Sequence, residues 1–466
     1  MAKNYGSIWG VAHFSTPRLS FEEAFAGVDP EDNTIVDPQT GETVDYDEEY
    51  TALAVETAEI AQDIETVADT NEAMDQGETL AQIGDAIEQS GREATPEEAA
   101  LIQTGVSNVL DKTGAPEEVV EEVTEQVATE SASGSPVLSM EGFKDVLLRM
   151  WQATKEFVAG IIARIKDAWR RFWNSTAGVV KAAEKLAKRA EGLEANPEAK
   201  IEKWSGIFKL LANAETKSFS IEDAVKDISV LKKEAAECGK LAQEASNTIH
   251  GKLDKVFGSD QAELIEIVKD IAKDVTSRGK SSLTDKIKNF FRFSKKVEGT
   301  GTKFRFGGAF QAYVADTDYL EGDNKNEVAY INSIKVLNGV DTKALSEIKK
   351  EGFSEAPLTP AQVVSLVGDV KDVAKALDKF YNTDSKKAHE AVDKIRKAVD
   401  EKVKALGEEA TDAQKHAAKV AQRLYYVPTQ LFRGEMDRCM YVIRTAKAFL
   451  SLGGLCLSKA KKKEAK

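Results

Sequence analysis

The side chains that could bind a metal ion or act as a nucleophile are few and lie far apart in the sequence. The histidines and cysteines are His13, His250, His389, His416, Cys238, Cys439 and Cys456. None of them forms a CxxC, HExxH or HxxxH pattern, the spacings that bring two ligands to one metal ion. The cysteines are also odd in number and widely spaced, which argues against a disulfide framework and fits a reducing compartment. We therefore predict no metal site.

Two glycine-containing stretches come close to nucleotide-binding motifs but lack required residues. Gly279-Lys280-Ser281 matches the end of a phosphate-binding loop, but Asp274 stands where that loop needs its first glycine, and its carboxylate would repel a phosphate. Gly299-Thr300-Gly301 is followed by Phe304 where a dinucleotide fingerprint needs its third glycine. The acidic cluster from Asp29 to Asp37 lacks the spacing of an EF-hand. The sequence thus predicts no catalytic residue, no cofactor and no enzyme.

Charge divides the chain at Glu141. Up to and including Glu141 there are 32 acidic and 4 basic residues, a net charge of −28. The other 325 residues have 46 acidic and 59 basic residues, a net charge of +13, so the overall net charge of −15 describes neither part. Such asymmetry indicates an acidic tail, or a basic body that meets nucleic acid or membrane.

Residues 1–141 are expected to be disordered or loosely helical. The run from Asp29 to Tyr50 has turn residues and clustered carboxylates and is typical of a loop. Residues 51–141 contain no Phe, Tyr or Trp, so helices there would bury little apolar area. Ser131–Pro136 is typical of an exposed linker. No signal peptide is evident at the N-terminus.

A basic, aromatic helical pattern follows the linker. Apolar residues recur at steps of three and four from Phe143 to Phe172, which predicts an amphipathic helix. It could be a core helix, an interfacial membrane helix or a DNA-facing surface. The residues that could contact DNA or a membrane are Lys144, Arg149, Trp151, Lys155, Arg164, Lys166, Trp169, Arg170, Arg171 and Trp173.

The remaining chain predicts a predominantly α fold. Helical patterns cover Ser175–Ala195, Pro197–Leu211, Ile221–Phe257, Ser259–Val275, Asp341–Lys349, Thr359–Tyr381, Ser385–Leu406, Thr411–Tyr425 and Thr429–Leu452. Alternating aromatic and β-branched residues in Phe290–Val340 predict two to four strands. The longest weakly polar run, Ala448–Leu457, has ten residues. That is half of the ~20 that a spanning helix needs, so no stable transmembrane anchor is expected.

The tripeptide Ser139-Met140-Glu141 closes the acidic part, directly after the linker and before the aromatic helix. The pattern of a small residue, any residue and Glu is common in this sequence, so its context gives it weight. With that context, the stretch from Ser131 to Trp173 resembles the internal head proteins of giant tailed bacteriophages of the phiKZ-like group. In that family a prohead protease removes an acidic or low-complexity propeptide by cleaving after such motifs.

The resemblance implies cleavage after Glu141. Ser139, Met140 and Glu141 would form the recognition motif, with Gly142 as the new N-terminus. Ala128-Thr129-Glu130 and Ser20-Phe21-Glu22 match the same pattern, so Glu130 and Glu22 are candidates for secondary cleavage. The chain would then comprise an acidic propeptide (1–141), a basic helical region (142–285), a strand-containing insert (286–340) and a helical C-terminal region with a basic tail (341–466).

The implied function is that of a non-enzymatic structural protein inside the capsid, assembled in the host cytoplasm. Its partners would be the prohead protease, packaged double-stranded DNA bound non-specifically, other head or scaffold proteins, and a membrane in transient contact. Ejection with the genome, and whether the propeptide targets, masks or scaffolds, are left open. Two rivals are a membrane-active helical protein whose helix 143–173 is masked by the acidic segment, and an enzyme with a scattered site.

Overall fold

The computed structural model describes residues 176–283, 297–321, 325–348, 350, 352–379, 386–405 and 411–463, with 35–36, 43–44, 104–106 and 108. Contacts divide the chain into two compact units. One unit is Met1–Asp47 with Thr176–Lys466, and the other is Glu48–Ser175. The described part of the second unit is a short helical stretch in which Val106 is buried.

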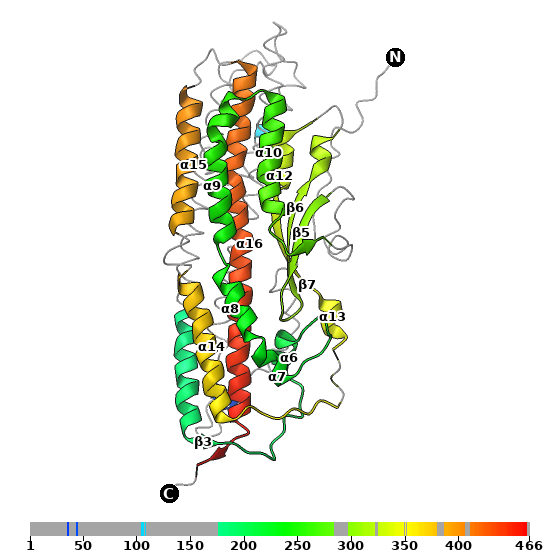
Figure 1. Ribbon diagram of the computed structural model, residues 1–466, viewed down its shortest axis with the longest axis vertical. Coiled ribbons are helices and arrows are strands. Elements are labelled where there is room, and N and C mark those ends of the chain that lie inside the picture. The colour runs from blue at the N-terminus through cyan, green and yellow to red at the C-terminus, as the bar shows by residue number, and fades with distance from the viewer. Residues whose placement is uncertain are drawn as a thin grey trace, which may run out of the picture. The chain divides into compact units, whose positions relative to one another are not determined.

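The described part of the first unit is predominantly helical, as the sequence predicted. Figure 1 shows several helices lying along one long helix, α16 (Asp412–Leu457). Its neighbours include α6 (Gly206–Leu211), α8 (Ile228–Ala236), α9 (Lys240–Gly258), α10 (Gln261–Thr276), α12 (Glu327–Ser333), α14 (Pro360–Lys379) and α15 (Lys386–Ala405). A helix over residues 176–191 packs beside α14, where Lys371 pairs with Glu184 at 3.1 Å.

Helix α16 is one helix where the sequence predicted two. Thr411 and Gln414 form a capping box at its start. Pro428 lies inside it, although an internal proline removes a hydrogen bond and costs about 3 kcal/mol or more. Val427 and Leu431, on either side of the proline, are both buried. The helix therefore continues because the packed core on both sides of Pro428 outweighs the local penalty.

The single helix predicted over Ile221–Phe257 is divided into three. Helix α7 (Ile221–Lys226) begins at Ser220, whose side chain accepts a hydrogen bond from the Asp223 N–H, and ends at Asp227. Helices α8 and α9 are separated at Gly239, whose φ of 78° is left-handed. Glycine adopts that conformation without a steric penalty, so the chain can turn there. The helix predicted from Pro197 is also shorter, because only α6 is helical there.

The strand prediction is confirmed in part. Strands β4 (Ser281–Ser282), β5 (Val297–Lys303), β6 (Ala309–Asp316) and β7 (Lys335–Val340) form an antiparallel sheet in the order β4-β5-β6-β7. Between β6 and β7, however, η2 (Thr317–Leu320) and α12 are helical. The Asn326 side chain caps α12 by accepting from the Ala329 N–H, which sets a helix start where alternating residues had suggested a strand.

The sheet lies against the helical bundle and is not isolated from it. Strand β6 is buried along almost its whole length, and Phe310, Ala312 and Val314 form an apolar cluster with Val297 on β5. Strand β7 contacts α16, and β6 contacts α10 and α12 (Figure 1). The predicted domain boundaries stay predictions.

Shorter elements complete the described chain. Strands β1 (Ile35–Val36) and β2 (Thr43–Val44) pair within a stretch that was predicted to be a loop, because β-branched residues flank its turn residues. Strand β3 (Leu193–Glu194) pairs with β8 (Lys461–Lys462), and α13 (Thr342–Ser346) follows β7.

One described segment, Asp437–Leu457 of α16, is long and apolar enough to span a membrane. Its most apolar window is 72% buried inside the bundle. A buried core helix passes the same test, so this segment is weak evidence for a membrane span.

Candidate functional site

The residues predicted to carry function all lie outside the described residues. These are the cleavage motif Ser139, Met140, Glu141 and Gly142, the secondary positions Glu130 and Glu22, and every predicted contact residue from Lys144 to Trp173. The cleavage site and the DNA or membrane surface therefore stay predictions. Within the described ranges, no group of three or more His, Cys, Asp or Glu side chains could hold a metal ion.

The two near-matches to nucleotide motifs lie at or within the sheet, since Gly279-Lys280-Ser281 leads into β4. The backbone N–H of Gly279 donates to Thr300 Oγ1 at 2.7 Å, and that of Lys280 donates to Thr302 Oγ1 at 3.3 Å. Gly299-Thr300-Gly301 lies in the middle of β5. A phosphate-binding loop needs free backbone N–H groups, and here those of Gly279 and Lys280 already have partners. Both stretches thus have a structural role.

The most distinctive site among the described residues is a group of polar side chains around the middle of α16, all of them buried except Glu237, which is about half exposed. We call it the polar centre, and it comprises Glu234, Glu237, Cys238, Gln311, Tyr313, Glu435, Arg438, Cys439 and Tyr441. They come from the end of α8, the α8–α9 junction, β6 and α16. The α16 members recur at three- and four-residue steps, which places them on one side of the helix.

Arg438 anchors the α8–α9 junction to α16. Its guanidinium Nη2 donates to Glu237 Oε2 at 2.7 Å, and its Cζ lies 5.5 Å from the centre of the Phe304 ring. Glu435 Oε1 accepts from the backbone N–H of Leu241 at 2.7 Å, near the start of α9. Charge-assisted hydrogen bonds of this kind are stronger than neutral ones. Two adjacent turns of α16 therefore hold this junction.

Gln311 joins the sheet to the same part of α16. Its Nε2 donates to the carbonyl oxygen of Gly434 at 2.9 Å and to Asn338 Oδ1 at 3.0 Å. Its Oε1 accepts from the Tyr313 hydroxyl at 2.5 Å. Asn338 Nδ2 in turn donates to Asp437 Oδ2 at 2.9 Å. The buried amide is therefore satisfied, and the network fixes the position of β6 and β7 against α16.

Burial dominates the protonation of the polar centre. It raises the pKa of Tyr313 to about 12 and raises the pKa of the Tyr441 hydroxyl and of the Cys439 thiol well above their usual values. It also raises the pKa of the Glu234 carboxyl to about 7, against the opposing effect of nearby Arg438. The thiol and hydroxyl groups are therefore almost entirely protonated at neutral pH, which makes them slow nucleophiles. The arrangement is suited to holding elements together.

Glu234 should make stability depend on pH. Because its pKa is higher in the folded chain than the usual 4.5, stability falls as pH rises from about 4.5 through about 7. We expect Glu234→Gln to raise the free energy of unfolding at pH 8 by up to roughly 3 kcal/mol, with the gain vanishing near pH 4.5. Urea unfolding at pH 8 and pH 5 checks this. An equal gain at both pH values would contradict it.

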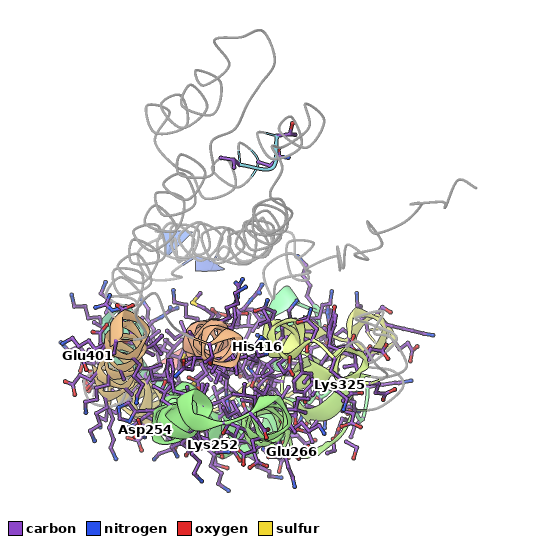
Figure 2. The ribbon with its side chains drawn as sticks, turned by 90° about the horizontal axis from the view of Figure 1, so that it is seen from above. Lys252, Asp254, Glu266, Lys325, Glu401 and His416 are labelled. Carbon is purple, nitrogen blue, oxygen red and sulfur yellow. The ribbon has the colours of Figure 1, made fainter. Side chains whose placement is uncertain are left out.

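Several lysines at the end of the bundle formed by α9, α10, α15 and α16 are paired with carboxylates. Figure 2 labels charged residues there. Lys402 Nζ lies 2.8 Å from Asp254 Oδ1, and Lys269 Nζ lies 2.8 Å from Glu266 Oε1. His416 Nε2 lies 3.4 Å from Glu327 Oε2. The two lysine pairs place a carboxylate beside each ammonium group, so these lysines are less available to bind phosphate.

The opposite end of the bundle presents lysines anchored near the C-terminus. Strand β8 pairs with β3, which places Lys461 opposite Glu194. Lys463 Nζ donates to the Glu191 carbonyl oxygen at 2.6 Å. We call the exposed Lys459, Lys461, Lys462 and Lys463 the basic end. The basic tail recognised in the sequence is therefore held in place as far as Lys463.

Comparison with known families identifies the group to which the chain belongs. The model of the phiKZ-like phage internal head proteins matches residues 40–448, most of the chain. The chain belongs to this family. Comparison with curated proteins and with solved structures gives no match.

Membership in the phiKZ-like internal head proteins confirms the family that the sequence resembled. It identifies a structural protein of the phage head, located inside the virion capsid and assembled in the host cell. As a member of this family, it is expected to associate with capsid components. The polar centre was missed in the sequence. Its signal there is the placement of Glu435 and Arg438 among the apolar residues of α16.

Proposed function

We propose that this internal head protein is made as a precursor whose acidic propeptide is removed by a prohead protease after Glu141. The observation that carries the proposal is the change in net charge from −28 to +13 at the Ser139-Met140-Glu141 motif. The family match, residues 40–448, spans both sides of that position, as expected if the family model represents a precursor.

The described core is compatible with that cut. Apart from Val106, every buried apolar residue of the described chain lies between Val179 and Leu457. Cleavage after Glu141 leaves this core in one continuous chain. The sequence predicts an exposed linker at Ser131–Pro136, and proteases reach such linkers more readily than packed helices.

The proposed role of the mature part is non-specific association with packaged double-stranded DNA. Residues 176–466 carry 52 basic and 43 acidic residues, a net charge of +9, and residues 142–175 add a further +4. Cations bind DNA by releasing counterions from its phosphates, without reading the bases. The precursor, at −15, should bind poorly because its acidic part repels phosphate.

The N-terminus of the protein taken from virions tests the cleavage directly. Intact mass and terminal peptide mapping should give a chain that begins at Gly142. Starts at Ser131 or Glu23 would reveal the secondary cuts after Glu130 and Glu22. A chain that begins at Met1 or Ala2 would overturn the proposed maturation and leave the acidic segment as a permanent tail.

DNA association should depend on salt and on the basic end. We expect the affinity of the mature chain for duplex DNA to fall as salt rises. Replacing Lys459, Lys461, Lys462 and Lys463 by Gln should reduce the slope of log affinity against log salt by up to about 3.6, at about 0.9 per phosphate contact. Fluorescence anisotropy with labelled duplex measures both quantities.

The matched control removes the same charge from lysines that are already paired. Lys226, Lys232, Lys269 and Lys402 contact Glu222, Asp372, Glu266 and Asp254. Their replacement by Gln should change the slope much less, because paired lysines are less available to phosphate. Equal slopes for the two variants would contradict the assignment of phosphate contacts to the basic end. An affinity for DNA that does not depend on salt would contradict the electrostatic mechanism.

A further inference from the structure

Two cysteines that are 201 positions apart in the sequence meet in the polar centre. Cys238 lies between α8 and α9, and Cys439 lies on α16. Both are free thiols and almost completely buried, with exposures of 1% and 0%. The Cys238 thiol is one of the groups that raise the pKa of the Cys439 thiol, so the two side chains are neighbours in this buried region.

Interactions of the flanking residues hold the segments that carry the two cysteines side by side. The residues that precede the cysteines, Glu237 and Arg438, form a hydrogen bond of 2.7 Å. Glu435 binds the backbone N–H of Leu241 at 2.7 Å, on the other side of Cys238. The Cys238 thiol also donates to the Glu234 carbonyl oxygen at 3.5 Å. The two segments are therefore fixed side by side, and a disulfide can form only between cysteines whose backbones lie that near each other.

We propose that Cys238 and Cys439 form an oxidative cross-linking site, at which a peroxide converts the two thiols into a disulfide that ties the α8–α9 junction to α16. The sulfur of one thiol attacks a peroxide oxygen, the O–O bond breaks, and the leaving hydroxide takes up the thiol proton, which gives a sulfenic acid and one water. The other sulfur then attacks that sulfenic sulfur, and the S–O bond breaks. Two thiols and one hydrogen peroxide thus yield one disulfide and two waters.

The environment sets when this reaction occurs. Burial raises the pKa of the Cys439 thiol, so the reactive thiolate is scarce and oxidation is slow at neutral pH. The host cytoplasm, where the head is assembled, keeps both thiols reduced. The cross-link therefore forms in virions that have left the host and met peroxide, and it is reversed by a reducing environment.

Cys456 provides a matched control within the same helix. It is also buried, and burial raises its pKa to about 12. Its sulfur interacts with the backbone of Leu358 instead of with a second thiol. Oxidation of Cys456 should therefore give no cross-link within the chain.

The experiment treats the full-length chain with hydrogen peroxide, alkylates the remaining thiols under denaturing conditions, and maps tryptic peptides. We expect a reducible link between the peptides Glu234–Lys240 and Cys439–Arg444, in the wild type and in Cys456→Ser but not in Cys439→Ser. Closing so long a loop should raise the Tm by roughly 5–10 °C, and dithiothreitol should abolish the rise. Circular dichroism verifies that each variant is folded.

Two results would overturn the proposal. One is treated wild-type protein in which Cys238 and Cys439 are recovered only as alkylated thiols or as sulfinic and sulfonic acids. The other is a cross-link that includes Cys456 and persists in Cys439→Ser. Because the wild type alone gives the first result, the test does not depend on how well the Cys439 variant folds.

Discussion

Glu141→Gln should leave the internal head protein at its full length in virions. Gln keeps the size of the Glu side chain but removes the negative charge, so a protease site built for a carboxylate loses a charged partner. Truncating one partner of a buried charge pair costs about 2–5 kcal/mol. That corresponds to cleavage slower by roughly 30-fold or more. Gel mobility and intact mass of the protein from variant virions measure the outcome.

Other triplets of the same pattern give the controls for this experiment. Glu56→Gln, in Ala54-Val55-Glu56, changes the charge by the same amount in the acidic part and should leave processing at Gly142 unchanged. Ser220-Ile221-Glu222 begins α7, where Ser220 caps the helix and Ile221 is buried. Ala388-His389-Glu390 lies within α15. Both should stay uncut in every variant. Normal processing of Glu141→Gln would remove Glu141 as the cleavage position.

Gly434→Ala should destabilise the contact between α16 and the sheet. A Cβ atom at this position would lie 2.3 Å from Val336 Cγ1 and 2.5 Å from Val336 Cβ, far inside van der Waals contact. Val336 is buried in β7, and Gln311 and Asn338 donate to the Gly434 carbonyl oxygen, so neither element can move freely. Overpacking costs about 1–3 kcal/mol. We expect a loss near the upper end, partly offset by the helix propensity of alanine.

Val336→Ala should rescue that variant in part. Removing the two γ-methyl groups eliminates the overlap with Cγ1, whereas the Cβ of residue 336 stays 2.5 Å from the new Cβ. The double variant should therefore be more stable than the sum of the two single changes predicts, and less stable than the wild type. Gly368→Ala in α14 is the matched control, because nothing lies within 4 Å of its added Cβ. It should stabilise the chain by about 1 kcal/mol. Urea midpoints compare the four variants with the wild type. An equal change in stability for Gly434→Ala and Gly368→Ala would contradict the predicted overlap with Val336.

The sequence by itself determined the family, the helical class and the charge division at Glu141. Each depends on information that is local in the chain: composition, helical spacing, and the Ser139-Met140-Glu141 motif in its context. Well-capped helices with one apolar side were also predictable for the same reason. Thr359–Tyr381 and Ser385–Leu406 were predicted, and α14 and α15 occupy Pro360–Lys379 and Lys386–Ala405.

Tertiary structure decided the features that depend on residues far apart in the chain. Packing keeps α16 helical through Pro428, where local propensity favours a break. It also gathers Glu234, Gln311 and Arg438 in one buried network and brings Cys238 against Cys439. A single sequence specifies which side chains can form such contacts. Burial of the shared core decides which of them meet, because the free energy gained by burying apolar surface exists only when the distant segments pack together.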